Sequence, residues 1–244
     1  MKKLKTIVFV LVAFCLISKA YSQRSGLIQM GTSVPVLEFA DHNTHENAIG
    51  GAAIGFNIGL QYIMHKFPKS GVEVFWGVDV NFNELQKDYK DDIEFRIGPS
   101  TIKTTNNTYS RYVNIPITAG LKYALTNDHI GVFANAGLAV NTLKITDMIA
   151  QTDNQTYIQQ MALAHSFGYK IGGGFLFNQD IIFTVDYLAL GKHSILNHVK
   201  EIHHYGALPN EDLKLKVNML TVTVGYKFNQ VKKINKTTSA VPMI

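Results

Sequence analysis

The feature that most constrains this chain is a long alternation of apolar and polar or small residues between Arg111 and Leu143. Apolar residues recur at every second position from Val113 to Tyr123, and the pattern resumes from Ile130 to Val140 after a short polar break. Because successive side chains of a strand point to opposite faces, this pattern predicts a β-hairpin with one apolar face. Each arm exceeds the about 5–6 residues of an ordinary soluble strand and reaches the about 9–11 residues of a strand that crosses a bilayer. The length of the hairpin therefore favours a membrane protein.

The same alternation occurs in eight segments, each long enough for one strand. They are Gly26–Phe39, Gly50–Phe67, Gly71–Leu85, the two arms of the hairpin, His165–Phe177, Ile181–His193 and Lys216–Phe228. In the last segment Val217 and Met219 fall on the otherwise polar face, which predicts a bulge near Met219 and Leu220.

The connections between these segments alternate in length. Three are tight turns, at Phe67–Ser70, Thr126–Asp128 and Asn178–Asp180; the others, about Ala40–Ile49, Gln86–Ser110, Lys144–Ala164 and Ser194–Leu215, are long. Barrels of the outer membrane have short periplasmic turns and long extracellular loops. We therefore predict an all-β fold, a closed, eight-stranded, antiparallel, up-and-down transmembrane β-barrel with four long extracellular loops.

The residue types on the two faces indicate which face meets lipid. The apolar faces are uniform in all eight segments, whereas the polar faces are rich in Gly, Asn and Thr and contain few Lys or Glu. An eight-stranded barrel leaves only enough interior room for side chains to fill it. Aromatic residues gather near the segment ends, as in the girdles of membrane barrels: Tyr62, Phe82, Tyr123, Phe175, Phe177, Tyr226 and Phe228. We expect the apolar faces to contact outer-membrane lipid and the lumen to be filled by side chains.

The N-terminus has the pattern of a secretory signal peptide. A basic start precedes an apolar run from Ile7 to Ile17, and Ala20 and Ser22 suit cleavage before Gln23. We predict a signal peptide at 1–22, a barrel at 23–228 and a flexible periplasmic tail at 229–244. Of the 23 Lys and Arg, four would leave with the signal (Lys2, Lys3, Lys5, Lys19), which leaves 19 against 18 Asp and Glu. This balance gives no reason to expect a nucleic-acid partner. The single cysteine, Cys15, would also leave, so no disulfide, thiolate metal ligand or cysteine nucleophile is expected.

Several motifs resemble one family. The run Tyr112-Val113-Asn114-Ile115-Pro116-Ile117, followed by Gly120-Leu121-Lys122-Tyr123, resembles a strand of Bacteroidetes-type outer-membrane β-barrel (porin-like) proteins, which are related to the eight-stranded OmpA and OmpX type. Similar motifs are Gly172-Gly173-Gly174, Asp186-Tyr187 with Leu190-Gly191, and Val224-Gly225-Tyr226-Lys227-Phe228. The resemblance covers most of the chain after the signal. It implies an outer-membrane location and specifies no activity.

Six charged residues fall at inward positions, three of each sign: Glu73, Asp79, Asp186, Lys122, Lys170 and Lys227. Buried charges must pair or be solvated. Counting from the turn at Asn178–Asp180, Lys170 and Asp186 lie nearly opposite each other, and Glu73 and Lys122 lie near the same end of adjacent strands. We predict that Glu73, Lys122, Lys170 and Asp186 form structural ion pairs in the lumen. A lumen that conducts protons or ions is the alternative.

The sequence offers little support for catalysis or metal binding. Seven of the nine histidines fall on the expected extracellular side (His42, His45, His165, His193, His198, His203, His204) without the tight spacing of a zinc site, so we expect them to be surface residues. Asp41 and His42 have no recognisable nucleophile beside them. The glycines from Gly50 to Gly55 lack the strand–turn–helix setting of a dinucleotide loop. We expect no catalytic residues, no cofactor and no metal.

These observations predict a monomeric, non-enzymatic surface or envelope protein that acts through its loops or an extracellular or periplasmic protein partner. The alternatives are a secretion or envelope-assembly component similar to the PorT family and a narrow ion-permeable porin.

Overall fold

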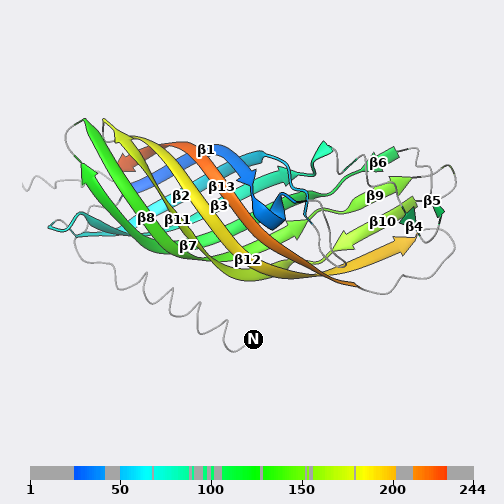
Figure 1. The fold of residues 1–244 in the computed structure, drawn as a ribbon. Coiled ribbons are helices and arrows are strands. Elements are labelled where there is room, and N and C mark those ends of the chain that lie inside the picture. Colours follow the sequence, from blue (N-terminus) through cyan, green and yellow to red (C-terminus); the bar gives the residue numbers. More distant parts are fainter. Residues whose placement is uncertain are drawn as a thin grey trace, which may run out of the picture.

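Long strands form the body of the molecule (Figure 1). The computed structural model describes residues 25–41, 50–67, 69–87, 90, 96–97, 100–101, 106–126, 129–151, 153, 156–178, 180–201 and 211–229. The long strands are β1 (Ser25–Pro35), β2 (Gly55–Phe67), β3 (Val72–Glu84), β7 (Arg111–Thr126), β8 (Ile130–Ile145), β11 (Ala164–Phe177), β12 (Ile181–Glu201) and β13 (Glu211–Asn229). The expected signal peptide, and all of the expected tail after Asn229, lie outside the described residues.

The long strands form a closed antiparallel ring. Their order is β11-β8-β7-β3-β2-β1-β13-β12, and pairing between β11 and β12 closes it. Each strand lies between its neighbours in the chain order, so the barrel is up-and-down, as the alternation predicts. A closed ring leaves no unpaired strand edge, which is what a sheet in hydrocarbon requires.

The outer wall is apolar along its length, which confirms the predicted faces. Among the described residues of the long strands, many large hydrophobic side chains are exposed, including Leu138 at 77% and Ile117 at 53%. The inward positions hold the polar side chains, including Asn57, Asn81 and Asn114, all of which are buried. This wall suits contact with lipid, because an apolar surface of this extent is unfavourable in water.

The two ends of the barrel differ. Short connections join β2 to β3, β7 to β8 and β11 to β12, whereas the connections at the other end are long. The long connections contain the 3-10 helix η1 (Leu37–Phe39) and the short strands β4 (Arg96–Ile97), β5 (Ser100–Thr101), β6 (Asn106–Thr108), β9 (Met148–Gln151) and β10 (Thr156–Met161). Three of these, β10, β9 and β6, continue the sheet beyond the barrel from the end of β12 (Figure 1). No helix among the described residues is long and apolar enough to span a bilayer.

Four expected strand limits were wrong. The second strand, expected from Gly50, begins at Gly55. The first strand ends at Pro35 and is followed by η1, because the chain turns inward there and buries Phe39. The strand expected to end at His193 continues to Glu201, and the strand expected to begin at Lys216 begins at Glu211. Pairing of Ile195 with Leu213 accounts for the longer strands, because both side chains are buried in the barrel.

The bulge expected near Met219 and Leu220 is not present, because both residues pair without a register shift. On β13 the inward phase is unbroken from Leu213 to Thr223, so Val217 and Met219 point into the barrel like the threonines that follow. The register shift falls on β12, between Ala189 and Lys192, where Gly191 has φ +82°. Glycine adopts this backbone conformation without steric cost, so the extra residue of the bulge is accommodated at Gly191.

The cost of placing a charge on the outer wall should depend on its depth in the bilayer. Replacing Ile117, near the middle of β7, by Arg is expected to destabilise the barrel by about 2–4 kcal/mol, and replacing Leu125, near the short-turn end of the same strand, by about 0–1 kcal/mol. Urea titrations in lipid vesicles measure both. Equal losses at the two positions would contradict the assigned wall.

Candidate functional site

A charged cluster spans the lumen. Lys170 on β11 lies with its Nζ 2.9 Å from Asp186 on β12 and 3.4 Å from Asp79 on β3. All three side chains are buried. Since β8 and β7 lie between β11 and β3 in the sheet, the contact to Asp79 crosses the barrel. The structure thus brings Lys170 and Asp186 together and adds Asp79 from the opposite wall.

Neutral amides satisfy the remaining carboxylate oxygens. Gln29 on β1 donates to Asp79 over 3.1 Å, and Asn135 on β8 donates to Asp186 over 2.9 Å. Five strands therefore contribute to one layer of charge and hydrogen bonds. Buried charges are tolerable only in such an arrangement, because an unpaired charge pays a large desolvation cost.

Two glycines make room for the aspartates. A Cβ atom at Gly59 on β2 would overlap Asp79 Oδ1, and one at Gly172 on β11 would overlap Asp186 Oδ1. Each glycine lies directly opposite its aspartate in the ladder. These two glycines therefore allow the aspartate carboxylates to lie against the neighbouring strand.

The structure does not join Glu73 to Lys122 in an ion pair, so this part of the prediction needs correction. The two residues are register partners on β3 and β7, but the Glu73 carboxylate lies 3.5 Å from Lys66. The Lys122 ammonium instead lies 3.9 Å from the ring centroid of Phe133, as in a cation–π contact. The register shift between Ile63 and His65 on β2 changes the alternation just before Lys66.

Toward the long-connection end, the lumen becomes an amide layer and then an apolar core. Asn57 donates to Asn81, and Asn141 donates to Asn114, both over 2.8 Å. Beyond them lies a buried apolar cluster whose largest side chains include Phe39 and Tyr112, with ring centroids 5.3 Å apart. Leu143, Leu188, Leu190, Leu215, Val217 and Met219 belong to the same cluster. A smaller cluster of Leu27, Leu176 and Ile182, packed by Phe133, occupies the short-turn end.

Among the histidines whose side chains the structure describes, His193 contradicts the expectation. It was expected at the surface, but its side chain is fully buried inside the barrel. Its Nε2 lies 2.8 Å from Ser166 Oγ and 3.0 Å from the Asn141 amide. Both partners approach the same ring nitrogen, so this is not the nucleophile–base–orienting-group order of a catalytic triad. His42, His45, His203 and His204 lie outside the described residues, and within the described part no cluster of three or more metal-ligating side chains occurs.

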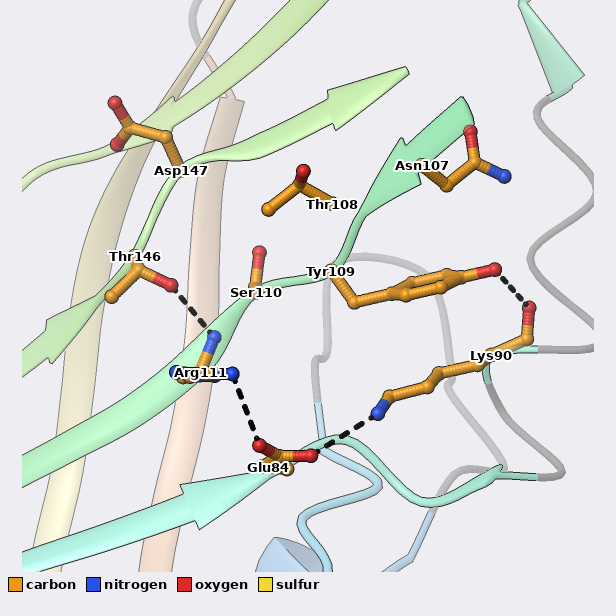
Figure 2. Close-up of a pocket in the computed structure, with 9 residues that line it drawn as sticks. All are labelled: Glu84, Lys90, Asn107, Thr108, Tyr109, Ser110, Arg111, Thr146 and Asp147. Atoms are coloured by element: carbon orange, nitrogen blue, oxygen red, sulfur yellow. Dashed lines mark hydrogen bonds and ion pairs between the residues drawn. The ribbon is translucent and has the colours of Figure 1, made fainter. Parts of the chain in front are cut away.

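A surface pocket of about 510 Å³ opens at the long-connection end (Figure 2). Its walls come from the end of β3, from β6, and from the residues around the start of β7 and the end of β8. Glu84 lies at its base, 3.3 Å from Arg111 and 3.4 Å from Lys90. The Tyr109 hydroxyl donates to the Lys90 carbonyl, and the Lys90 ammonium lies 5.5 Å from the centre of the Tyr109 ring. The remaining lining residues are Asn107, Thr108, Ser110, Thr146 and Asp147.

Sequence reasoning placed this region in loops and did not identify the pocket. The available signal was the group of charges and hydroxyls around Tyr109 at the start of a strand. These residues converge because β6 pairs with β9, although β7 and β8 lie between those two strands in the sequence.

A closed ring with an apolar outer wall and polar side chains on its inner face defines the class of the protein, which is an outer-membrane β-barrel. The family described as "Outer membrane protein beta-barrel domain" matches residues 6–228. The chain belongs to this family and is located in the outer membrane. No match to a curated protein was found.

Solved outer-membrane proteins are similar in overall structure. OprG of Pseudomonas aeruginosa is 14% identical, with 86% of this chain and 99% of that chain covered and a TM-score of 0.47. Ail of Yersinia pestis, solved in complex with the heparin analogue sucrose octasulfate, is 12% identical, with 84% and 99% covered and a TM-score of 0.42. Outer membrane protein W of E. coli is 12% identical, with 86% and 100% covered and a TM-score of 0.37.

The charged layer makes a prediction about stability. Lys170→Met leaves two buried carboxylates without their cation and is expected to destabilise the barrel by about 3–5 kcal/mol. Adding Asp79→Asn and Asp186→Asn should restore much of the loss, because the layer is then neutral. Urea unfolding measures each variant, with Lys90→Met as a control at an exposed pair, where about 1 kcal/mol or less is expected. If Lys170→Met left the stability unchanged, or if the triple variant were as unstable as the single one, the stabilising role of the charged layer would be contradicted.

Proposed function

We propose that this protein is a non-enzymatic, monomeric surface protein whose lumen does not conduct and which acts through its extracellular end. The observation that carries this proposal is the filling of the lumen by buried side chains from one end to the other. A solute would have to displace the apolar cluster around Phe39 and Tyr112, then the charged layer at Lys170, then the cluster at Leu176 and Ile182. The resemblance of the Tyr112–Tyr123 strand supports placing the protein among Bacteroidetes-type barrels.

The pocket lined by Glu84, Lys90, Tyr109 and Arg111 is the binding site that we propose for this surface. Its volume is within the usual range for small-molecule sites. Two carboxylates, Glu84 and Asp147, balance two cations, Lys90 and Arg111, so the pocket does not select strongly for an ion of either sign. Carboxylates accept hydrogen bonds, and ammonium and guanidinium groups donate them. This mixture, with hydroxyls and an aromatic ring, suits a ligand rich in hydroxyl groups, such as an extracellular saccharide.

Thiol labelling tests the closed lumen. In a Cys15→Ala background, Ala139→Cys places a thiol in the buried interior, and Thr108→Cys places one at the exposed rim. A water-soluble maleimide should label Thr108→Cys on intact vesicles and should label Ala139→Cys only after unfolding. Planar-bilayer recordings of the wild-type protein should show no discrete conductance steps. Rapid labelling at 139 together with such steps would establish the ion-permeable alternative.

Glycan binding tests the pocket. Detergent-purified protein applied to an array of bacterial and host glycans should retain a subset of them. The Glu84→Gln/Arg111→Gln variant removes both charges of one ion pair and should lower retention at least about fivefold, since each charged hydrogen bond contributes about 1.5–3 kcal/mol. Lys69→Gln, at the short-turn end, is the control and should bind as the wild type does. Absence of retention, or equal retention by the pocket variant, would overturn the proposed site.

A further inference from the structure

Three lysines project from the outer surface of β12 and β13. Lys192 lies directly opposite Lys216 in the antiparallel ladder, and Lys214 lies opposite Ser194 on the same face. All three side chains are exposed. Like charges directly opposite each other on neighbouring strands are destabilising. A bound anion would offset this repulsion.

The bulge at Gly191 creates this juxtaposition. Before it, the even-numbered residues Asp186, Leu188 and Leu190 point into the barrel. After it, the inward positions are His193 and Ile195. Without the extra residue Lys192 would face the lumen, so the local backbone geometry turns its ammonium group outward.

Within the described part of the chain, Glu38 alone is paired with a lysine of the cluster. Lys216 lies 3.3 Å from Glu38 of η1, in a pair whose two side chains are both largely exposed. Exposed pairs of this kind contribute only about 0–1 kcal/mol. Among the side chains that the structure describes, no carboxylate lies within ion-pair distance of Lys192 or Lys214. Most of the positive charge is therefore available to a ligand.

The cluster lies at the edge of the lipid-facing wall. Tyr187 and Leu220, which are register partners, are the last lipid-facing pair on β12 and β13 before the bulge. The Tyr187 hydroxyl donates to Asn218, and its ring lies 6.4 Å from that of Tyr169. Tyrosine favours the interface between hydrocarbon and headgroups. The lysines come next toward the long-connection end, within a few steps of about 3.4 Å per residue. This level corresponds to the headgroups of the outer leaflet, because the long connections of such barrels are extracellular.

We propose that Lys192, Lys214 and Lys216 form a binding site for the phosphate of an outer-leaflet lipid headgroup. An ammonium group binds phosphate as a point charge, and three of them on one face offset the repulsion between Lys192 and Lys216. The site is continuous with the surface that holds the acyl chains, so a phosphorylated lipid can occupy both at once. It lies on the outer wall of β12 and β13, apart from the pocket between β3, β6 and β7.

Lipid retention in nanodiscs tests the site. Wild-type protein is placed in phosphatidylcholine nanodiscs that contain a small fraction of diphosphorylated lipid A, and bound lipid is measured by native mass spectrometry. The test variant is Lys192→Gln/Lys214→Gln. Its charge-matched control is Lys69→Gln/Lys87→Gln, which alters two exposed lysines away from β12 and β13. Heat-modifiable gel migration verifies that each barrel is folded.

The expected result is a loss of lipid A affinity of about fivefold for each lysine removed, since each contributes about 1 kcal/mol at an anionic surface. The control should retain lipid A as the wild type does, and Lys192→Arg/Lys214→Arg should recover most of the binding. Dephosphorylated lipid A should bind the wild type as weakly as intact lipid A binds the test variant. Equal retention by wild type and test variant, or competition by inorganic phosphate at concentrations similar to that of lipid A, would overturn the assignment to a lipid.

Discussion

The hydrogen-bonding needs of the backbone in hydrocarbon govern the rest of this structure. Lipid offers no partner for an N–H or C=O group, so the sheet has to close on itself. Closure by pairing of β11 with β12 gives every strand one face toward lipid and one toward the lumen. Polar side chains are then confined to the lumen and the two ends. The two-residue alternation along the chain is a direct consequence of this confinement.

Because the lumen is narrow, the polar side chains inside it must also pack closely against one another. An eight-stranded barrel holds side chains and little else, so Lys170 has to find its counter-charges there, and Asp79 and Asp186 supply them from two other strands. Toward the long-connection end, the interior becomes an apolar core. Leu188, Leu190, Val217 and Met219 belong to that core. Their inward position explains why Val217 and Met219 are apolar on an otherwise polar face.

The bulge on β12 determines which of the following side chains face the interior and which face outward. Beyond the extra residue, the side chains of β12 that would have faced outward face inward, and the reverse. His193 therefore points into the barrel, where it contacts Ser166 and Asn141. Lys192 points outward. The apolar residues Val217 and Met219 suggested a bulge on β13, but this strand keeps its phase. The register of the ladder, together with the positive φ of Gly191, places the extra residue on β12 instead.

Periodicity and residue type were enough to predict the eight strands, the closed barrel, the lipid-facing residues and the inward position of Lys170 and Asp186, because each of these depends on side-chain alternation within a strand. The contact of Lys170 with Asp79, the pairing of Glu73 with Lys66, the pocket around Tyr109 and the opposition of Lys192 and Lys216 were decided by the folded chain. These depend on barrel diameter, strand register and the position of bulges, and such quantities arise only when distant strands are paired.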